Sequence, residues 1–312
     1  MSVRRGLSLL GLKVDMIVTL SLIFAISAFV FIYLLGPSLG LMGGIVAALG
    51  FNVFMWLISP YLIKAMYGLR PLSNEDDPWL YSTVETIAMR SGLKYMPKLY
   101  LAPIDVPNAF AFGSPIFGYG VAVTRGLLNT LSEEEIEAVL GHEIGHIKHG
   151  DMHVMMIATA LPAIFLHIGR WIMWSSMFSS RDRDEGGAIY LVGIALMVIG
   201  WILYLLALRL SRLREFYADA HSAIIVERGA DKLQRALVNI AKHSDPKLGA
   251  QLASAKALLI VDPTQASEVS EDVRAIMERE ASLFERIMGI FSTHPRIEDR
   301  LRKLEELKRS IL

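Results

Sequence analysis

Four long apolar runs restrict the folds that are open to this chain. Residues 16–35, 39–63 and 187–208 contain no charged residue, and residues 152–178 contain one, Arg170. A stretch of about 20 predominantly apolar residues crosses the hydrocarbon core of a bilayer. The buried helices of soluble proteins are seldom so long and so apolar. The sequence therefore predicts a mainly helical membrane protein.

The composition agrees with this prediction and excludes several other classes of protein. Of the 312 residues, 53% are apolar and 20% are charged, whereas a soluble domain has about 45–50% and about 25%. The 31 basic residues balance the 31 acidic ones, which argues against a protein that binds nucleic acid through a basic surface. The chain contains no cysteine, so disulfides, thiolate metal sites and cysteine nucleophiles are excluded.

The order of the runs predicts two transmembrane hairpins. Only the residues 36–38 separate the first two runs, so we expect 14–63 to form one hairpin. The segment 151–208 holds the other two runs and forms the second hairpin. Arg170 and His167 interrupt the third run, which leaves open whether it crosses the bilayer or lies half-buried at the surface.

Basic residues predict the side of the membrane on which the hydrophilic segments lie. They flank the apolar runs, whereas the turn between the first two runs carries none. The positive-inside rule therefore places residues 1–13, 64–150 and 209–312 in the cytoplasm. The basic residues concerned are Arg4, Arg5, Lys13, Lys64, Arg70, Lys148, Arg209, Arg212 and Arg214.

The two longer cytoplasmic segments predict a folded domain assembled from two parts of the chain. The part at 64–150 mixes helices and strands, and the part at 209–312 is mostly helical with an amphipathic end. Ser132 and Glu135 are spaced as a capping box, which starts a helix that runs to about Gly150. The other elements predicted in the first part are a helix that starts at Asp77-Pro78 and strands at 98–102, 106–112 and 117–124.

The capped helix contains the sequence His142-Glu143-Ile144-Gly145-His146. Two histidines four positions apart lie on one face of a helix, one turn apart, where they can bind the same zinc ion. Glu143 stands beside the first histidine and can take a proton from the water that such an ion activates. A surface helix with incidental His and Glu is the alternative, but the capping box and the nearby apolar run favour a metal site.

A hydrolytic zinc site needs a third protein ligand and an open position for water. His149 and His153 continue the histidine stripe, but His153 lies two turns beyond His146, too far along the helix axis to share its ion. We therefore interpret His149 and His153 as interfacial or supporting residues. Glu215, on the helix that follows the fourth apolar run, is the better candidate.

Asp219 lies one turn after Glu215 on the same helical face. Its carboxylate could accept a hydrogen bond from the outer nitrogen of a ligating histidine and so fix the tautomer of that histidine. Two acidic residues at this spacing are also typical of a solvated helix face. The predicted topology favours the metal site, because it places both residues on the same side of the membrane as the histidine pair.

Together these features resemble the HtpX branch of the M48 family of membrane metallopeptidases. The resemblance implies that His142, His146 and Glu215 bind one zinc ion per chain. It also implies that Glu143 is the catalytic base and that Asp219 supports a zinc ligand. The resemblance covers both apolar hairpins and the motifs NAFAFG at 108–113, HEIGHIKHGD at 142–151, RLREFYADA at 212–220 and STHPRIEDR at 292–300.

The same resemblance implies a strand that binds substrate and two further residues in the cleft. The strand would be an edge of the sheet, where an extended peptide can pair with its backbone. It comprises Asn108, Ala109, Phe110, Ala111 and Phe112. His294 and Arg300 would stabilise the oxyanion or bind substrate carbonyls. Arg296 stands where the family usually has a proline, so capping of the last helices by His294 and Arg300 is the alternative.

We therefore expect a mainly α membrane protein with two transmembrane hairpins and a cytoplasmic α+β zincin-like (gluzincin) metallopeptidase domain. The expected function is that of a zinc-dependent endopeptidase of the cell membrane, which cleaves membrane or misfolded proteins at the cytoplasmic face in quality control and the stress response. Its partners would be polypeptide substrates and the lipid bilayer, and a homo-oligomer is left open. The alternatives are a CAAX-type prenyl-protein peptidase and a non-enzymatic zinc-binding membrane protein or transporter.

Overall fold

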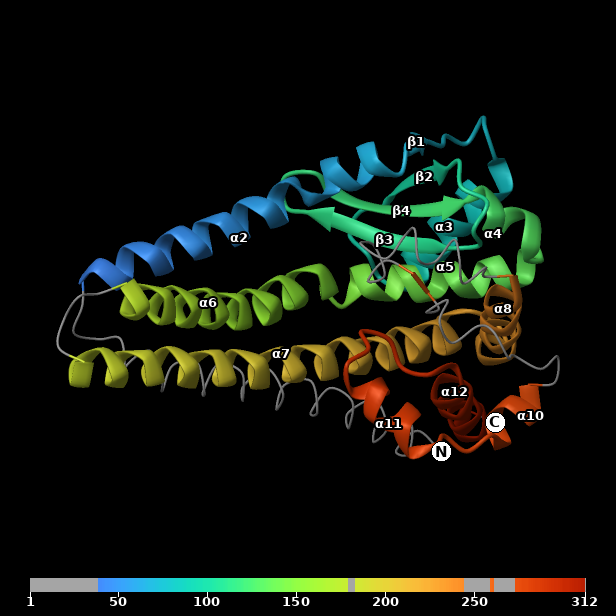
Figure 1. Cartoon of the computed structure of the whole chain (residues 1–312). Coiled ribbons are helices and arrows are strands. Elements are labelled where there is room, and N and C mark those ends of the chain that lie inside the picture. Colours follow the sequence, from blue (N-terminus) through green and yellow to red (C-terminus); the bar gives the residue numbers. More distant parts are fainter. Residues whose placement is uncertain (1–38, 179–182, 244–258, 261–272, 312) are drawn as a thin grey trace. The chain divides into compact units, whose positions relative to one another are not determined.

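The computed structural model of the chain describes residues 39–178, 183–243, 259–260 and 273–311 (Figure 1). Side chains are described for the same residues except 39–49, 51, 178, 183–186 and 311. The predicted apolar run at 16–35 and the turn at 36–38 lie outside the described residues.

The described chain is mostly helical and divides into two compact units. The first unit takes Leu57–Met152 and the described part of Ser211–Leu312. The second takes His153–Leu210 and the described part of Asp15–Trp56. Both units therefore draw on distant parts of the sequence.

The first unit contains a four-stranded sheet with the strand order β1-β2-β4-β3. Its strands are β1 (Arg70–Pro71), β2 (Lys98–Ala102), β3 (Ala109–Ser114) and β4 (Gly118–Thr124). Strands β2 and β4 are parallel, and the other neighbours are antiparallel. Strand β3 therefore lies at one edge of the sheet, as predicted.

Three of these strands confirm the predicted ones, with a shift at two of their starts. Strand β2 has the predicted bounds, and β4 starts one residue later than predicted. Strand β3 ends at Ser114 instead of residue 112, and it starts at Ala109 instead of residue 106. The reason is that Pro107 has no N–H to donate, and the Thr124 hydroxyl donates to Val106 O at 2.7 Å. The two-residue strand β1 gave no sequence signal.

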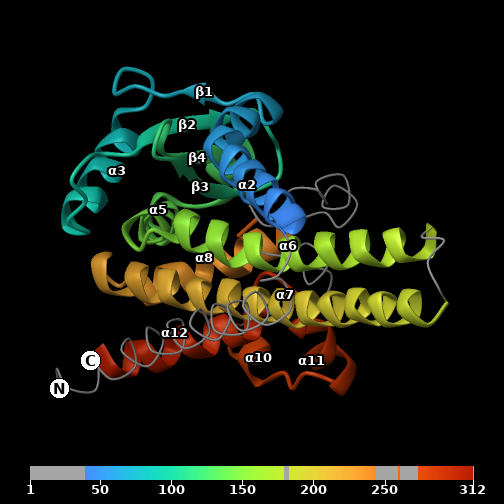
Figure 2. The same ribbon diagram turned by 90° about the vertical axis from the view of Figure 1, so that its left-hand side faces the viewer.

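The helices beside the sheet begin where their caps predict. Helix α3 (Pro78–Arg90) starts at Asp77, whose side chain accepts a hydrogen bond from Leu80 N. Helix α5 (Glu133–Lys148) starts with the predicted capping box. It contacts β3 and β4 on one side (Figure 2). The short helix α4 (Arg125–Thr130) between β4 and α5 was not predicted.

The remaining helices of the first unit complete its core. They are α8 (Gly229–His243), α10 (Val273–Glu278), α11 (Leu283–Ile290) and α12 (Ile297–Ile311). Helix α8 packs against α5 and α12. The buried side chains that join the sheet, α5, α8 and α12 include Val121, Val123, Leu140, Ile144, Leu237 and Leu301. This core holds α5 in a fixed place beside the sheet.

Three long helices contribute to the second unit. They are α2 (Leu39–Met66), α6 (Asp151–Phe178) and α7 (Arg183–Ile225). Helices α6 and α7 lie side by side (Figures 1 and 2), with Gly169 and Gly193 at a close contact where an added Cβ would meet backbone at 2.7 Å and 2.9 Å. Two stretches of the described residues, Asp151–Met177 and Gly187–Ile225, are long and apolar enough to cross a membrane.

Candidate active site

Helix α5 supplies the two histidines and the glutamate of the motif to the interior of the first unit. His142, Glu143 and His146 are all buried. His142 Nε2 and His146 Nε2 lie 3.1 Å apart, because residues one helical turn apart project in the same direction. Two ring nitrogens directed at one point are the arrangement that a shared metal ion requires.

Two glycines of α5 allow α7 to approach closely. A Cβ at Gly141 would lie 3.0 Å from Ser222 Oγ, and one at Gly145 would lie 3.2 Å from the His221 ring. The close approach is fixed by a buried hydrogen bond that Ser222 Oγ donates to Ala138 O at 2.6 Å. It places the last turns of α7, which carry Glu215, beside the histidine face of α5.

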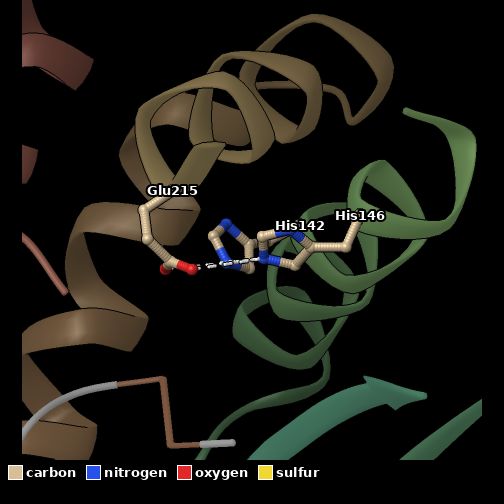
Figure 3. Close-up of side chains that lie close together, drawn as sticks. All are labelled: His142, His146 and Glu215. Carbon is tan, nitrogen blue, oxygen red and sulfur yellow. Dashed lines mark hydrogen bonds and ion pairs between the residues drawn. The ribbon is translucent and has the colours of Figure 1, made fainter. Parts of the chain in front are cut away.

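Glu215 completes a group of three metal-binding side chains (Figure 3). Glu215 Oε2 lies 3.6 Å from His142 Nε2, and Glu215 Oε1 lies 3.6 Å from His146 Nε2. A tetrahedral zinc ion with bonds of about 2.0–2.2 Å separates its ligand atoms by about 3.3–3.6 Å. Glu215 Oε2 is also buried without a hydrogen-bond donor in the described part of the chain. The donor set and its spacing therefore fit a metal ion.

Asp219 and Arg300 form a chain of contacts behind His142. Asp219 Oδ1 lies 2.9 Å from His142 Nδ1. Arg300 donates to both carboxylate oxygens of Asp219, from Nε at 2.9 Å and from Nη2 at 2.6 Å. Its Nη1 donates to Ile260 O at 2.7 Å. Arg300 thus lies in the interior behind His142, and its side chain is 2% exposed. Its guanidinium is occupied by hydrogen bonds to Asp219 and Ile260 O.

A second carboxylate behind the site, Asp151, was not among the residues predicted from the sequence. Asp151 Oδ2 lies 2.5 Å from His146 Nδ1, and Asp151 Oδ1 lies 3.1 Å from Arg214 Nε. Five positions separate Asp151 from His146, a spacing that would point away in a continuous helix. The chain turns at Gly150, which has a φ of +68° between α5 and α6, and this turn brings Asp151 back. In the sequence, the only indication of this role was that Asp151 is the last residue of the HEIGHIKHGD motif.

His294 approaches the group from the loop between α11 and α12. Its Nδ1 lies 3.3 Å from Glu215 Oε2, and the residue is buried. Arg296, which replaces the proline usual in the family, instead pairs with Glu298 at 2.8 Å. The replacement therefore leaves His294 next to Glu215.

The edge strand β3 contacts Glu143 directly. Ala111 N–H donates to Glu143 Oε2 at 2.7 Å. Thr124 N–H donates to Asn108 O at 2.9 Å, so in the antiparallel pairing the alternate residues Ala109, Ala111 and Gly113 turn their peptide groups to the open edge. Asn108 precedes the strand, and its Oδ1 accepts a hydrogen bond from Ile260 N at 3.0 Å.

Neither His149 nor His153 joins the group of ligands. His149 ends α5, and its ring packs on Tyr217 with 4.2 Å between ring centroids. The His153 ring contacts Trp56 in the second unit, with 5.2 Å between ring centroids. Both histidines therefore lie outside the group of ligands, and their interpretation as interfacial or supporting residues stays a prediction.

Burial and the carboxylates shift two pKa values on α5. Burial alone lowers the pKa of His142, but Asp219 and Glu215 outweigh burial and raise it to about 10. Burial raises the pKa of Glu143, and the imidazoles of His142 and His146 offset this only in part. Without a metal, His142 therefore holds a proton at neutral pH that a metal ion must displace.

The site combines paired imidazoles with a carboxylate from a second helix, and an acidic side chain lies beside the open edge of the sheet. These are the parts of a metallopeptidase. The fold and the site therefore define the class of metallopeptidases. The family model "Peptidase family M48" matches residues 74–308. The chain belongs to this family of peptidases.

Several curated relatives carry the name "Protease HtpX homolog". One from Aeropyrum pernix is 40% identical, over 83% of this chain and 84% of its own length. One from Thermoplasma acidophilum is 34% identical over 99% of both chains. A solved structure, the crystal structure of S. mikatae Ste24p, shares the fold with a TM-score of 0.56 at 19% identity, covering 92% of this chain and 67% of that one.

These comparisons confirm the predicted resemblance. The protein is an HtpX-like membrane metallopeptidase that acts on polypeptides and uses a metal cofactor. The relatives support a protease and give no support to a prenyl-protein peptidase or to a non-enzymatic zinc protein.

Proposed function

We propose that this chain is a zinc-dependent endopeptidase that cleaves membrane or misfolded proteins at the cytoplasmic face of the cell membrane. The observation that carries the proposal is the spacing of three donors: the two Nε2 atoms of His142 and His146 are 3.1 Å apart, and each is 3.6 Å from Glu215. Two imidazoles and one carboxylate suit zinc, whereas Mg²⁺ and Ca²⁺ prefer oxygen ligands.

Glu143 is the base in this proposal. Bound zinc would supply a Lewis acid that activates water and polarises the scissile carbonyl. Glu143 takes a proton from the attacking water and passes it to the leaving amine. The raised pKa of Glu143 suits this role, because burial makes its carboxylate a stronger base.

The open edge of β3 is the proposed binding site for the substrate backbone. An extended peptide that pairs with Ala109, Ala111 and Gly113 would be held regardless of its side chains. This mode suits a protease that acts on misfolded proteins of many sequences. The Ala111 N–H becomes available to the substrate when Glu143 turns from it towards the attacking water.

Two further residues of the site act in different ways. We propose that His294 donates a hydrogen bond to the carbonyl oxygen as negative charge develops there. Arg300 is a positioning residue, because its guanidinium is engaged by Asp219. Asp219 in turn orients His142.

The membrane part of the proposal rests on the apolar helices and their basic flanks. We propose that 14–63 and 151–208 form two transmembrane hairpins, and that 64–150 and 209–312 form the cytoplasmic gluzincin domain. His146 precedes α6 by five positions in the sequence. Such a short connection suits substrates that are themselves embedded in the membrane.

The test is cleavage by purified full-length protein in lipid nanodiscs. An unfolded soluble protein and an embedded membrane protein serve as substrates. We expect a chelator to stop cleavage of both and Zn²⁺, but not Mg²⁺, to restore it. Activity that persists with the chelator would refute zinc dependence. Cleavage of the soluble protein alone would refute the assignment of membrane proteins as substrates.

A further inference from the structure

Helix α11 exposes the apolar side chains that a water-soluble helix would bury. None of its residues is buried. Leu283 is 75% exposed and Phe284 is 71% exposed, and both begin a face with a helical spacing. The other exposed apolar residues on this face are Ile287, Met288, Ile290 and the adjoining Phe291.

The polar side of α11 contacts the protein through Glu285. Glu285 pairs with Arg279 at 2.8 Å and lies 3.9 Å from Arg296. Both arginines also pair with Glu298 in the first turn of α12. A capping box at Ser282 fixes the start of the helix. These contacts set the orientation of α11 and point its apolar face outwards.

The end of α11 is tied to helix α7. Arg212 donates from Nη1 to Ile290 O at 2.9 Å and to Ser292 O at 2.6 Å. Arg212 lies about one helical turn beyond Leu208, where the uncharged apolar run of α7 ends. Helix α11 is therefore tied to α7 at a residue that follows the uncharged apolar run by about one helical turn.

We propose that α11 is an interfacial helix whose apolar face lies in the headgroup region of the bilayer. An amphipathic helix with Phe and Leu on one side and charged residues on the other is typical of such helices. We favour lipid over another protein as the partner of this apolar face. The chain is a membrane protein, and the hydrogen bonds from Arg212 attach α11 next to the predicted span of α7. The exposed Arg286 on the polar side suits anionic headgroups.

This contact would be additional to the transmembrane helices and does not depend on the peptidase reaction. It would anchor the segment that carries His294, three residues after Phe291. Membrane contact would thereby restrict the position of His294 relative to the bilayer.

The absence of cysteine from the chain allows a direct test with single-cysteine variants of the full-length protein. Phe284→Cys and Ile287→Cys place a bimane label on the apolar face, and Met89→Cys on α3 is the control because Met89 is 67% exposed. The labelled proteins are reconstituted in phosphatidylcholine and phosphatidylglycerol vesicles. Brominated phospholipid reports contact with lipid, and iodide on both sides of the vesicles reports contact with water.

We expect brominated lipid to quench the labels at 284 and 287 at least about twice as strongly as the label at 89. Iodide should quench the label at 89 more strongly than the labels at 284 and 287. Strong iodide quenching at 284 and 287 would overturn the proposal. Labels shielded from both quenchers would overturn it as well, because they would show that protein, such as a substrate or a second copy, covers the face. Neither readout requires zinc or cleavage, so the result is independent of the proposed reaction.

Discussion

His146 Nδ1 lies 2.5 Å from Asp151 Oδ2, although the two residues belong to different helices. The relationship repeats on the other histidine, where Asp219 Oδ1 lies 2.9 Å from His142 Nδ1. Each of these carboxylates is itself paired with an arginine, the half-buried Arg214 for Asp151 and the buried Arg300 for Asp219. Both imidazoles are thus oriented from behind, which directs their Nε2 atoms at one point.

The first prediction concerns Asp151. We expect Asp151→Asn to weaken zinc binding by about 10- to 100-fold, because the supporting carboxylate of a ligating histidine is lost. Competition with a fluorescent zinc chelator measures the affinity. Asp105→Asn is the control, since the Asp105 side chain is 74% exposed and pairs only with Arg125 at the surface among the described contacts. Equal zinc affinity in the two variants would contradict the role of Asp151.

Glu143→Gln is expected to retain zinc and to lose cleavage by about 10²–10⁴-fold, the contribution typical of a general base. The glutamine keeps the size of the side chain and can still accept the hydrogen bond from Ala111 N. Metal content and cleavage rate are measured on the same preparation. Glu134→Gln, at an exposed position of the same helix, should behave like the parent protein. Parent-like cleavage by Glu143→Gln would remove Glu143 from the mechanism.

Glu215→Ala is expected to lose zinc during purification, because only two imidazoles would remain as ligands. Elemental analysis of the purified protein reports the zinc content. Glu227→Ala, at an exposed position two residues after α7, serves as the comparison and should keep its metal. A full zinc complement in Glu215→Ala would reassign the third ligand.

Zinc binding is expected to release a proton at neutral pH. The pKa of His142 is raised to about 10 without metal, so the imidazole is protonated below that pH and must lose its proton to bind zinc. The apparent zinc affinity should therefore rise as the pH rises from 6 towards about 10. Calorimetry in buffers of different ionisation enthalpy counts the protons. Binding without proton release, with a pH-independent affinity, would contradict this prediction.

Arg300→Gln is expected to destabilise the protein more than a surface change, by about 3–5 kcal/mol, because it removes the arginine that pairs with both oxygens of the buried Asp219 carboxylate. Thermal unfolding in detergent measures the change. The double variant Arg300→Gln with Asp219→Asn should lose less than the sum of the two single variants, since the two side chains act as a pair. Strict additivity would show that the pair is not coupled.

Much of the local structure of this chain could be predicted from its sequence. The capping box at Ser132, the apolar runs and the spacing of His142 and His146 are properties of a few neighbouring residues. The helix period alone converts that spacing into a shared face. The start of α5 and the bounds of β2 were predictable for the same reason.

Tertiary structure decided which distant groups meet at the site. Arg300 pairs with Asp219 across 81 positions, and the turn at Gly150 returns Asp151 to His146. The outward apolar face of α11 depends likewise on the ion pairs of Glu285 with Arg279 and Arg296. Each of these contacts depends on how the packed helices approach one another. Glycines such as Gly141 permit a close approach. The spacing of neighbouring residues does not encode which side chains then meet. The sequence thus determined the identity of the chemical groups, and packing of the whole chain determined their partners.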